Sequence, residues 1–284
     1  MVCTRGVSEI QRKGQIGVTF GEGLGRLLPT TPGGSVERSI LETKDFPGWM
    51  RYSEFLCGYL AEGEDLAVLD LGGGANPILG DAGLKNLTYD LLDIDATELQ
   101  KAEGDYSNLF CGDAAMPTDG FLAAVEGRSY DLVFSHMFLE HVQNPDQVHR
   151  NIFAILKPGG YAIHAYPTNN NLPLAMNSVL PERLSLSILR LVQPHRDLDG
   201  KLAKFPAYYK RCFAPSPRAK KYFEGYGYEV VQHLGYAGHG YYRRIPVLRS
   251  LEMVGRKVVV ALQLPWIVFN VVVLRRPEAS PSAS

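Results

Sequence analysis

The amino-acid sequence predicts an α/β fold in which the central sheet is doubly wound and mostly parallel. Three observations support this prediction. Apolar runs with strand character alternate with segments of helical periodicity, 284 residues suffice for one large domain, and no internal repeat appears. Because parallel neighbours are joined by right-handed crossovers, this alternation implies helices on both faces of the sheet.

Seven strands are expected where short apolar runs are bounded by turn residues. They fall at 66–71, 87–94, 108–111, 130–135, 160–166, 228–234 and 266–274. Helices are expected at 49–60, 145–156, 217–223 and 247–260. The second helix is the most clearly delimited: Asn144 can cap it, Pro145 suits its first position, and the segment Lys157-Pro158-Gly159-Gly160 stops it.

The rhythm of strands and helices is absent at the start of the chain and after the fifth strand. Residues 1–48 are Gly-rich and weakly patterned, so we expect a flexible arm that caps an occupied site. Residues 49–284 form the predicted domain, and an insertion at about 168–216 is expected to bind the acceptor.

The apolar stretch 258–274 needs a separate interpretation. It is shorter than the ~18–20 residues that span a bilayer and contains Gln263, Pro265 and Asn270. We interpret it as the end of a buried helix followed by the last strand. A peripheral membrane contact through 258–274 is the less favoured alternative.

Composition restricts the function classes. A formal net charge of -1 argues against a protein built to bind nucleic acid. The four cysteines are scattered, which indicates reduced thiols in a cytoplasmic protein, and the first residues lack the apolar core of a signal peptide. The oligomeric state is left open by the sequence.

The strongest local signal is a strand that ends in Asp70 and runs into Gly72, Gly73 and Gly74. Glycines allow the backbone to approach a bound nucleoside, and open α/β sheets bind ligands at this strand end. A dinucleotide fingerprint requires Gly or Ala five residues after Gly72, where this chain has Pro77. A carboxylate at Asp70 also suits a cationic sulfonium or ammonium better than a pyrophosphate. The loop therefore favours S-adenosylmethionine over NAD.

Two further acids follow the next two predicted strands. Asp93, followed by Ile94, is placed for hydrogen bonds to ribose hydroxyls, and Asp95 is its rival for that role. Asp113 can accept from an adenine amino group while the amide of Ala114 donates to a ring nitrogen. Each acid alone is ordinary turn chemistry, but the ordered set indicates a nucleoside site.

The stretch 68–166 resembles the class I S-adenosylmethionine-dependent methyltransferase family, in the type 11 or ubiquinone-type branch. The matching segments are VLDLGGGANP, YDLLDIDATEL, CGDAAMP, YDLVFSHMFLEHV and LKPGGYAIHAYP. The resemblance implies a Rossmann-like fold and S-adenosylmethionine as cofactor. It also implies that Asp70 and the glycines hold the methionine end, Asp93 the ribose, and Asp113 with Ala114 the adenine. Ser135 and His136 would line the cofactor near its reactive methyl.

Some ubiquinone-type relatives bind a metal through a Glu three residues before a Glu-His pair. Here Glu140-His141 is present but the upstream residue is Met137, so no metal site is expected. The absence of an N-P-P-[YF]-type motif argues against methylation of nucleic acids. The expected reaction is O-methylation of a small-molecule or glycan-type acceptor; the alternative is a non-catalytic protein that binds S-adenosylmethionine.

A hydroxyl acceptor needs a proton acceptor, and histidine serves this purpose near neutral pH. His141 is the first candidate and His136 the second, while His164 can equally be a core residue. Aromatic and polar side chains are expected to contact the acceptor, with cations beside some of them: Tyr166, Asn169, Tyr208, Tyr209, His239 and Tyr241.

Overall fold

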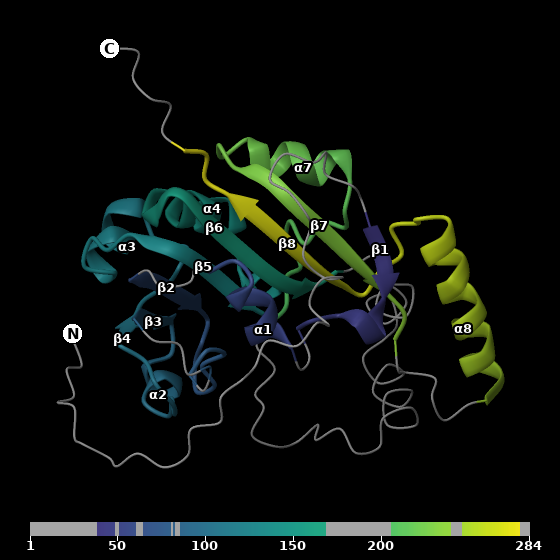
Figure 1. Ribbon diagram of the computed structural model, residues 1–284, viewed down its shortest axis with the longest axis horizontal. Helices are drawn as coiled ribbons and strands as arrows, with labels where there is room; N and C mark the ends of the chain where they lie inside the picture. The colour runs from purple at the N-terminus through teal and green to yellow at the C-terminus, as the bar shows by residue number, and fades with distance from the viewer. Residues whose placement is uncertain are drawn as a thin grey trace.

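The computed structural model describes residues 39–48, 51–60, 65–80, 82, 86–168, 206–239 and 246–278, and its centre is one eight-stranded sheet (Figure 1). The strand order is β1-β7-β8-β6-β5-β2-β3-β4. The strands are β1 (Ser39–Glu42), β2 (Leu66–Leu71), β3 (Leu87–Asp93), β4 (Asn108–Cys111), β5 (Tyr130–His136), β6 (Leu156–Pro167), β7 (Glu229–Ala237) and β8 (Phe269–Arg275).

The sheet is mostly parallel, which confirms the predicted fold class. β2 lies between β3 and β5 and is parallel to both, while β8 runs antiparallel between β6 and β7. The prediction of seven strands was one too few, because β1 pairs in parallel with β7 at the edge. Four residues are too few for a period-2 pattern to stand out in the sequence. Residues 43–48 of the predicted arm form a 3-10 turn and the segment after it, and residues 1–38 lie outside the described residues.

Helices cover both faces of the sheet, as a doubly wound topology requires. One core lies beneath α3, α4 and α7, and a second lies beneath α1 and α2. The helices are α1 (Tyr52–Cys57), α2 (Ala96–Leu99), α3 (Thr118–Ala124), α4 (Pro145–Ile155), α7 (Pro217–Glu224) and α8 (Pro246–Ala261), with 3-10 turns η2 (Thr43–Asp45) and η3 (Leu139–His141).

The signals that predicted α4 have the expected structural roles. The side chain of Asn144 accepts a hydrogen bond of 3.3 Å from the backbone N–H of Gln147, and Pro145 occupies the first turn. Val148, Ile152 and Ile155 are buried against the sheet. α4 therefore holds the loop after β5 at a fixed place above the carboxyl ends of the strands.

The prediction that the last helix is buried was wrong. Of the residues of α8, only Val259 is buried, and the helix stands at the margin of the molecule beyond β1 (Figure 1). The final strand begins at Phe269 instead of Trp266. Among the described residues, no helix combines the length and the hydropathy that a bilayer crossing requires.

Candidate active site

The turn after β2 needs glycines because its backbone adopts left-handed angles and a neighbouring side chain leaves no space for a β-carbon. Gly72 has φ +76° and Gly74 has φ +46°, in the left-handed region that side chains disfavour. A β-carbon on Gly72 would also lie 2.6 Å from Cδ2 of Phe138. The N–H of Gly72 donates to the carbonyl of Leu92 at 2.8 Å, which joins this turn to the end of β3.

Asp70 lies under the glycine turn, and its side chain is buried. Its Oδ2 accepts hydrogen bonds from the hydroxyl of Tyr89 at 2.8 Å and from the N–H of Ile78 at 3.5 Å. Burial raises the pKa of Asp70 to about 7, and these two donors only partly oppose that shift. The carboxyl group of Asp70 thus supports the glycine turn from below, and its role at the methionine end of the cofactor stays a prediction.

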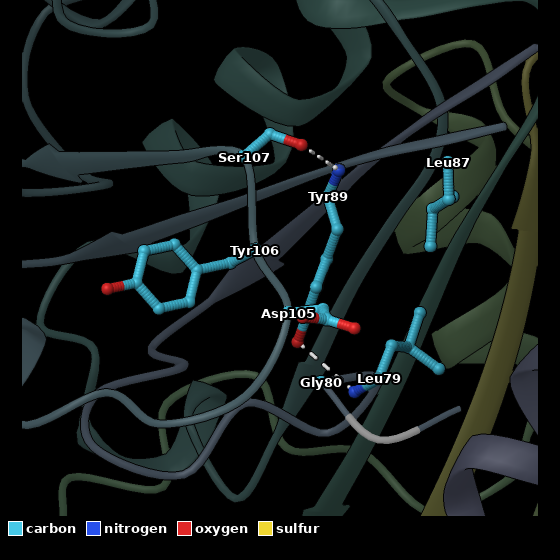
Figure 2. A pocket seen from close by; sticks show the side chains of 7 residues that line it. All are labelled: Leu79, Gly80, Leu87, Tyr89, Asp105, Tyr106 and Ser107. Carbon is cyan, nitrogen blue, oxygen red and sulfur yellow. Dashed lines mark hydrogen bonds between the residues drawn. The ribbon is translucent and has the colours of Figure 1, made fainter. Parts of the chain in front are cut away.

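A small pocket adjoins this support (Figure 2). It has a volume of about 120 Å³ and is lined by Leu79, Gly80, Leu87, Tyr89, Asp105, Tyr106 and Ser107. Ligand sites are usually 300–1,000 Å³. Leu87 is the first residue of β3, whereas the glycine turn lies at the carboxyl end of β2. This pocket is therefore not the candidate site. One of its walls is Tyr89, whose hydroxyl accepts a 3.3 Å hydrogen bond from the backbone N–H of Leu79.

The end of β3 separates the roles of two neighbouring acids. Asp93 is half-buried, accepts from the N–H of Asp95 at 2.9 Å, and has a pKa raised chiefly by burial. Its Oδ2 is 3.4 Å from where a β-carbon on Gly74 would stand, so the carboxylate faces the glycine turn. Asp95 instead caps α2, accepting from the N–H groups of Thr97 and Glu98. Asp93 is thus the acid available for a ligand.

The apolar residue after Asp93 faces solvent. Ile94 is 66% exposed at the carboxyl edge of the sheet, where a flat base can cover it. Sulfur Sγ of the exposed Cys111 lies 3.7 Å from the carbonyl of Ile94, and the N–H of Gly112 donates to the carbonyl of Asp93 at 2.9 Å. The ends of β3 and β4 are therefore held together as one surface.

The loop after β4 is fastened from below by a side chain that the sequence analysis missed. Asn151, on α4, is buried and donates through Nδ2 to the carbonyls of Ala114 and Met116, both at 2.8 Å. Asp113 is exposed, and its Oδ1 accepts from the N–H of Ala115 at 2.8 Å. Nothing in the local pattern around Asn151 marks this role, because the two segments meet only in the folded chain.

The end of β5 corrects one expected cofactor residue. Ser135 is fully buried, and its hydroxyl lies 2.9 Å from Nδ1 of His164, which is also fully buried. Burial holds the pKa of His164 well below its usual range. The side chains of Ser135 and His164 belong to the core, so neither faces the cofactor.

His136 is half-buried at the same strand end, where α1 packs over it. Its ring lies 5.3 Å from the ring of Tyr52, and burial lowers its pKa. The hydroxyl of Tyr52 donates to the carbonyls of Ser135 at 3.0 Å and Ile163 at 3.3 Å. α1 therefore covers this part of the carboxyl edge and keeps His136 neutral.

The loop that follows β5 carries a buried acid beside the candidate base. Glu140 is 4% exposed, and its Oε2 has no hydrogen-bond partner in the described part of the chain. Burial raises the pKa of Glu140 to about 8. Its Oε1 lies 3.7 Å from Nε2 of His141, which is partly exposed. Met137, which opens this loop, has φ +50°, a strained value for a side-chain-bearing residue.

The segment that returns after residue 205 packs directly on this loop. The N–H groups of Tyr208 and Tyr209 donate to the carbonyl of Glu140 at 2.7 and 3.0 Å. Nδ1 of His141 lies 3.1 Å from the carbonyl oxygen of Pro206, and the amide of Gln143 donates to the hydroxyl of Tyr208 at 2.8 Å. Two predicted acceptor residues are thereby brought to the candidate base.

The cations of this segment fasten it to the body of the domain. Nζ of Lys210 donates to the carbonyl of Gln143 at 3.0 Å, and Nε of Arg211 lies 3.7 Å from Oδ1 of Asp146. The guanidinium of Arg211 also lies over the ring of Tyr222. Lys210 and Arg211 therefore anchor this segment to the domain rather than form a site for an anionic acceptor.

The remaining predicted acceptor residues have different outcomes. Tyr166 is buried in the core, where its hydroxyl lies 3.4 Å from the carbonyl of Phe213, so it is removed from the acceptor set. The N–H of His239 donates to Oε1 of Glu252 on α8 at 3.3 Å, just beyond the end of β7, and its contact with the acceptor stays a prediction. Asn169 and Tyr241 lie outside the described residues. Among the described residues, no group of three or more His, Cys, Asp or Glu side chains is placed to hold a metal ion.

Comparison with known proteins assigns the family. A family model described as a methyltransferase domain matches residues 42–233. The chain belongs to the class I S-adenosylmethionine-dependent methyltransferase family. The predicted family and cofactor are thereby confirmed: S-adenosylmethionine is the cofactor of this methyltransferase. No curated protein sequence matches the chain.

Solved structures share the fold of this methyltransferase at low sequence identity. An S-adenosylmethionine-dependent methyltransferase from Archaeoglobus fulgidus is 14% identical with a TM-score of 0.49, over 79% of this chain and 91% of that one. Phosphoethanolamine N-methyltransferase 2 from Haemonchus contortus, in complex with phosphomonomethylethanolamine and S-adenosylhomocysteine, is 14% identical with a TM-score of 0.50, over 81% of this chain and 53% of that one. The [4+2]-cyclase SpnF is 12% identical with a TM-score of 0.48, over 81% and 82%. These likenesses concern the fold alone.

The residues of the methyltransferase fit its cofactor. The glycine turn leaves the backbone open to a nucleoside, Asp93 points a carboxylate at that turn, and Ile94 offers an exposed apolar surface. Asp113 adds an exposed carboxylate on the adjacent loop. The glycine turn, the two acids and the apolar surface thus lie along the carboxyl ends of β2, β3 and β4, where open α/β sheets bind ligands, and the part of the cofactor that each contacts stays a prediction.

Proposed function

We propose that the methyltransferase transfers a methyl group to a hydroxyl group of a small-molecule or glycan-type acceptor, with His141 as proton acceptor. One contact carries the proposal. Nδ1 of His141 lies 3.1 Å from the carbonyl oxygen of Pro206, and a carbonyl only accepts hydrogen bonds. Nδ1 therefore carries the proton in the neutral ring, and the lone pair is on Nε2.

S-adenosylmethionine supplies an electrophilic methyl group on a sulfonium. In O-methylation the oxygen–carbon bond forms, the sulfur–carbon bond breaks, and the hydroxyl proton passes to Nε2 of His141. Oε1 of Glu140 lies 3.7 Å from that nitrogen. When the ring becomes cationic, its charge lowers the pKa of the neighbouring Glu140 carboxyl group.

The acceptor is proposed to lie against Tyr208 and Tyr209. Both are tied by their backbone to Glu140, so that their position is fixed relative to His141. Tyr209 and Arg211 have φ of +51° and +61°, and strained backbone is often retained at functional sites. Because Lys210 and Arg211 already bond to the domain, a neutral polyhydroxylated acceptor suits the segment better than a phosphorylated one.

The test is transfer of a labelled methyl group to a panel of hydroxyl, amine and carboxylate acceptors, with wild type, His141→Gln and Tyr208→Phe. For a hydroxyl acceptor, His141→Gln is expected to lower kcat by about 100-fold. Its affinity for S-adenosylhomocysteine should be unchanged. Tyr208→Phe should act mainly on KM.

Three results would contradict the proposal at different points. Transfer to amines alone rejects O-methylation. A hydroxyl substrate turned over at the wild-type rate by His141→Gln rejects the base. Binding of S-adenosylhomocysteine without transfer to any member of the panel favours the non-catalytic alternative.

A further inference from the structure

The helix α8 is attached to the domain through its polar side. Oε1 of Glu252 accepts from the N–H of His239 at 3.3 Å. Beyond the helix end, the side-chain amide of Gln263 pairs with both backbone groups of Ile40, accepting its N–H at 2.8 Å and donating to its carbonyl at 3.1 Å. Arg256 lies near Glu42, with 3.9 Å between Nε and Oε2. These contacts fix which side of the helix faces β1.

The opposite side of α8 is an apolar stripe that faces solvent. At 100° per residue, its members fall within an arc of roughly 80°. They are Val247, Leu251, Val254 and Val258, together with Leu262 in the turn that follows the helix, and all are exposed. A surface helix ordinarily turns such a stripe toward the core. Figure 1 shows α8 at the margin of the sheet, apart from the helices that cover its two faces.

The charges of α8 indicate what the stripe contacts. Arg249 and Lys257 are exposed, and neither has an ion-pair partner within the part of the chain that the structure describes. The one acidic residue of the helix, Glu252, faces the domain. At 100° per residue, Lys257 lies about 100° from the centre of the stripe and borders it, whereas Arg249 lies about 180° from that centre. A second copy of α8 would bring another lysine to this border, whereas phosphate head groups complement Lys257.

An exposed tryptophan lies just beyond the helix. Trp266 is 66% exposed and lies five residues after the last residue of α8. Indole side chains favour the boundary between lipid head groups and acyl chains, because one edge is polar and the ring is apolar. Lys257, at the flank of the stripe, can extend its amine toward the same head groups.

We propose that the stripe of α8 docks on the surface of a lipid bilayer that contains anionic phospholipids. The helix lies in the plane of the interface, with Val247 to Leu262 toward the acyl chains and Lys257 at the head groups. This contact shares only Val258, Leu262 and Trp266 with the 258–274 contact considered from the sequence, because Val271 to Leu274 are buried in β8. It is independent of the cofactor site and of the reaction at His141.

The test is flotation of the full-length protein with vesicles of phosphatidylcholine, with and without phosphatidylglycerol. Wild type is expected to float with the anionic vesicles, and less as salt rises. Leu251→Glu should weaken this binding by about tenfold or more, because it charges the centre of the stripe. Met253→Glu is the matched control: it adds the same charge at an exposed apolar residue of the same helix, outside the stripe.

A second readout reports insertion directly. In a Trp49→Phe background, Trp266 is the sole tryptophan, and its fluorescence is expected to shift to the blue with anionic vesicles. Binding of S-adenosylhomocysteine and the Tm show that each variant is folded. Equal flotation of Leu251→Glu and Met253→Glu would overturn the proposal. The absence of flotation by wild type would also overturn it. In that case, a dimer in light scattering that Leu251→Glu dissociates would indicate that a second copy covers the stripe. A monomer whose Tm is lowered by Leu251→Glu would indicate that another segment of the chain covers it.

Discussion

The hydroxyl of Tyr89 donates a 2.8 Å hydrogen bond to Oδ2 of Asp70, directly beneath the glycine turn. The same hydroxyl receives the N–H of Leu79, so one side chain links the end of β2 to the segment after the turn. Asp70 is thereby partly stabilised as a carboxylate where burial favours its neutral form. The shape of the turn depends on this support.

Tyr89→Phe should weaken the turn without removing the ring. The loss of a hydrogen bond to a buried acid is expected to cost about 1–2 kcal/mol of unfolding free energy and to raise the pKa of Asp70 further. Affinity for S-adenosylhomocysteine should fall several-fold. Chemical denaturation and calorimetry measure the two effects. Tyr106→Phe, at an exposed tyrosine beside the same pocket, is the control; equal results for the two variants would argue against the role of Tyr89.

Gly72→Ala tests whether the turn needs space as well as a left-handed backbone. Gly72 has φ +76° and Gly127 has φ +67°, so alanine carries a similar backbone strain of about 1 kcal/mol at both. Only at Gly72 would the new methyl group meet Phe138; at Gly127 nothing lies within 4 Å. Gly72→Ala should therefore lose affinity for S-adenosylhomocysteine, whereas Gly127→Ala should keep it. Retained binding in both variants would mean that the turn tolerates a side chain.

Asp93→Ala and Asp95→Ala separate ligand binding from helix capping. Asp93→Ala is expected to reduce affinity for S-adenosylhomocysteine by about 10–100-fold, since it removes a charged hydrogen-bond acceptor. Asp95→Ala removes the cap of α2 and should lower the Tm modestly with little effect on affinity. Isothermal titration and thermal unfolding of both variants provide the comparison. The reverse order of affinities would assign the ribose contact to Asp95.

Glu140→Gln should change the pH dependence of stability. The pKa of Glu140 is about 8 in the folded chain against an ordinary 4.5, so the folded state holds a proton that the unfolded state has released. This contribution favours the folded state at low pH and is lost as pH rises from about 4.5 to 8. Relative to wild type, Glu140→Gln should gain a few kcal/mol over this window.

Denaturant titrations near pH 5 and pH 8 measure this gain, with the exposed Glu54→Gln as the control. Parallel stability curves for wild type and Glu140→Gln would show that Glu140 is ionised in the folded state. Burial also raises the pKa of Asp70, to about 7, so Asp70 lowers the free energy of unfolding in the same direction over a lower pH range. This decrease should be common to wild type and Glu140→Gln.

Much of the site was accessible from the sequence because its signals are local. The glycines after β2, Asp93 after β3 and Asp113 after β4 follow strands whose apolar runs are short and well bounded. Parallel strands bring their carboxyl ends to one edge, so the order of these residues in the chain becomes their order in space. The family resemblance rests on the same segments.

Burial and partnership were decided by contacts between distant segments. The side chain of Ser135 on β5 contacts His164 on the neighbouring strand β6 and is therefore buried in the core. Asn151 on α4 bonds to the loop after β4. Tyr208 meets Glu140 only because the chain returns over the loop after β5. None of these pairings leaves a periodic trace, since each joins residues that are far apart in sequence.

The sequence by itself determined the alternation of strands and helices, the turn chemistry and hence the cofactor class, because periodicity and glycine conformation act within a few residues. Tertiary structure alone decided that Asp70 lies under the turn, that Glu140 is buried beside His141, and that α8 turns its apolar stripe outward. An amphipathic pattern gives a helix two faces, but only the surface it meets decides which face is covered. Here Gln263 and Glu252 bind the domain, and the apolar side is left to another partner.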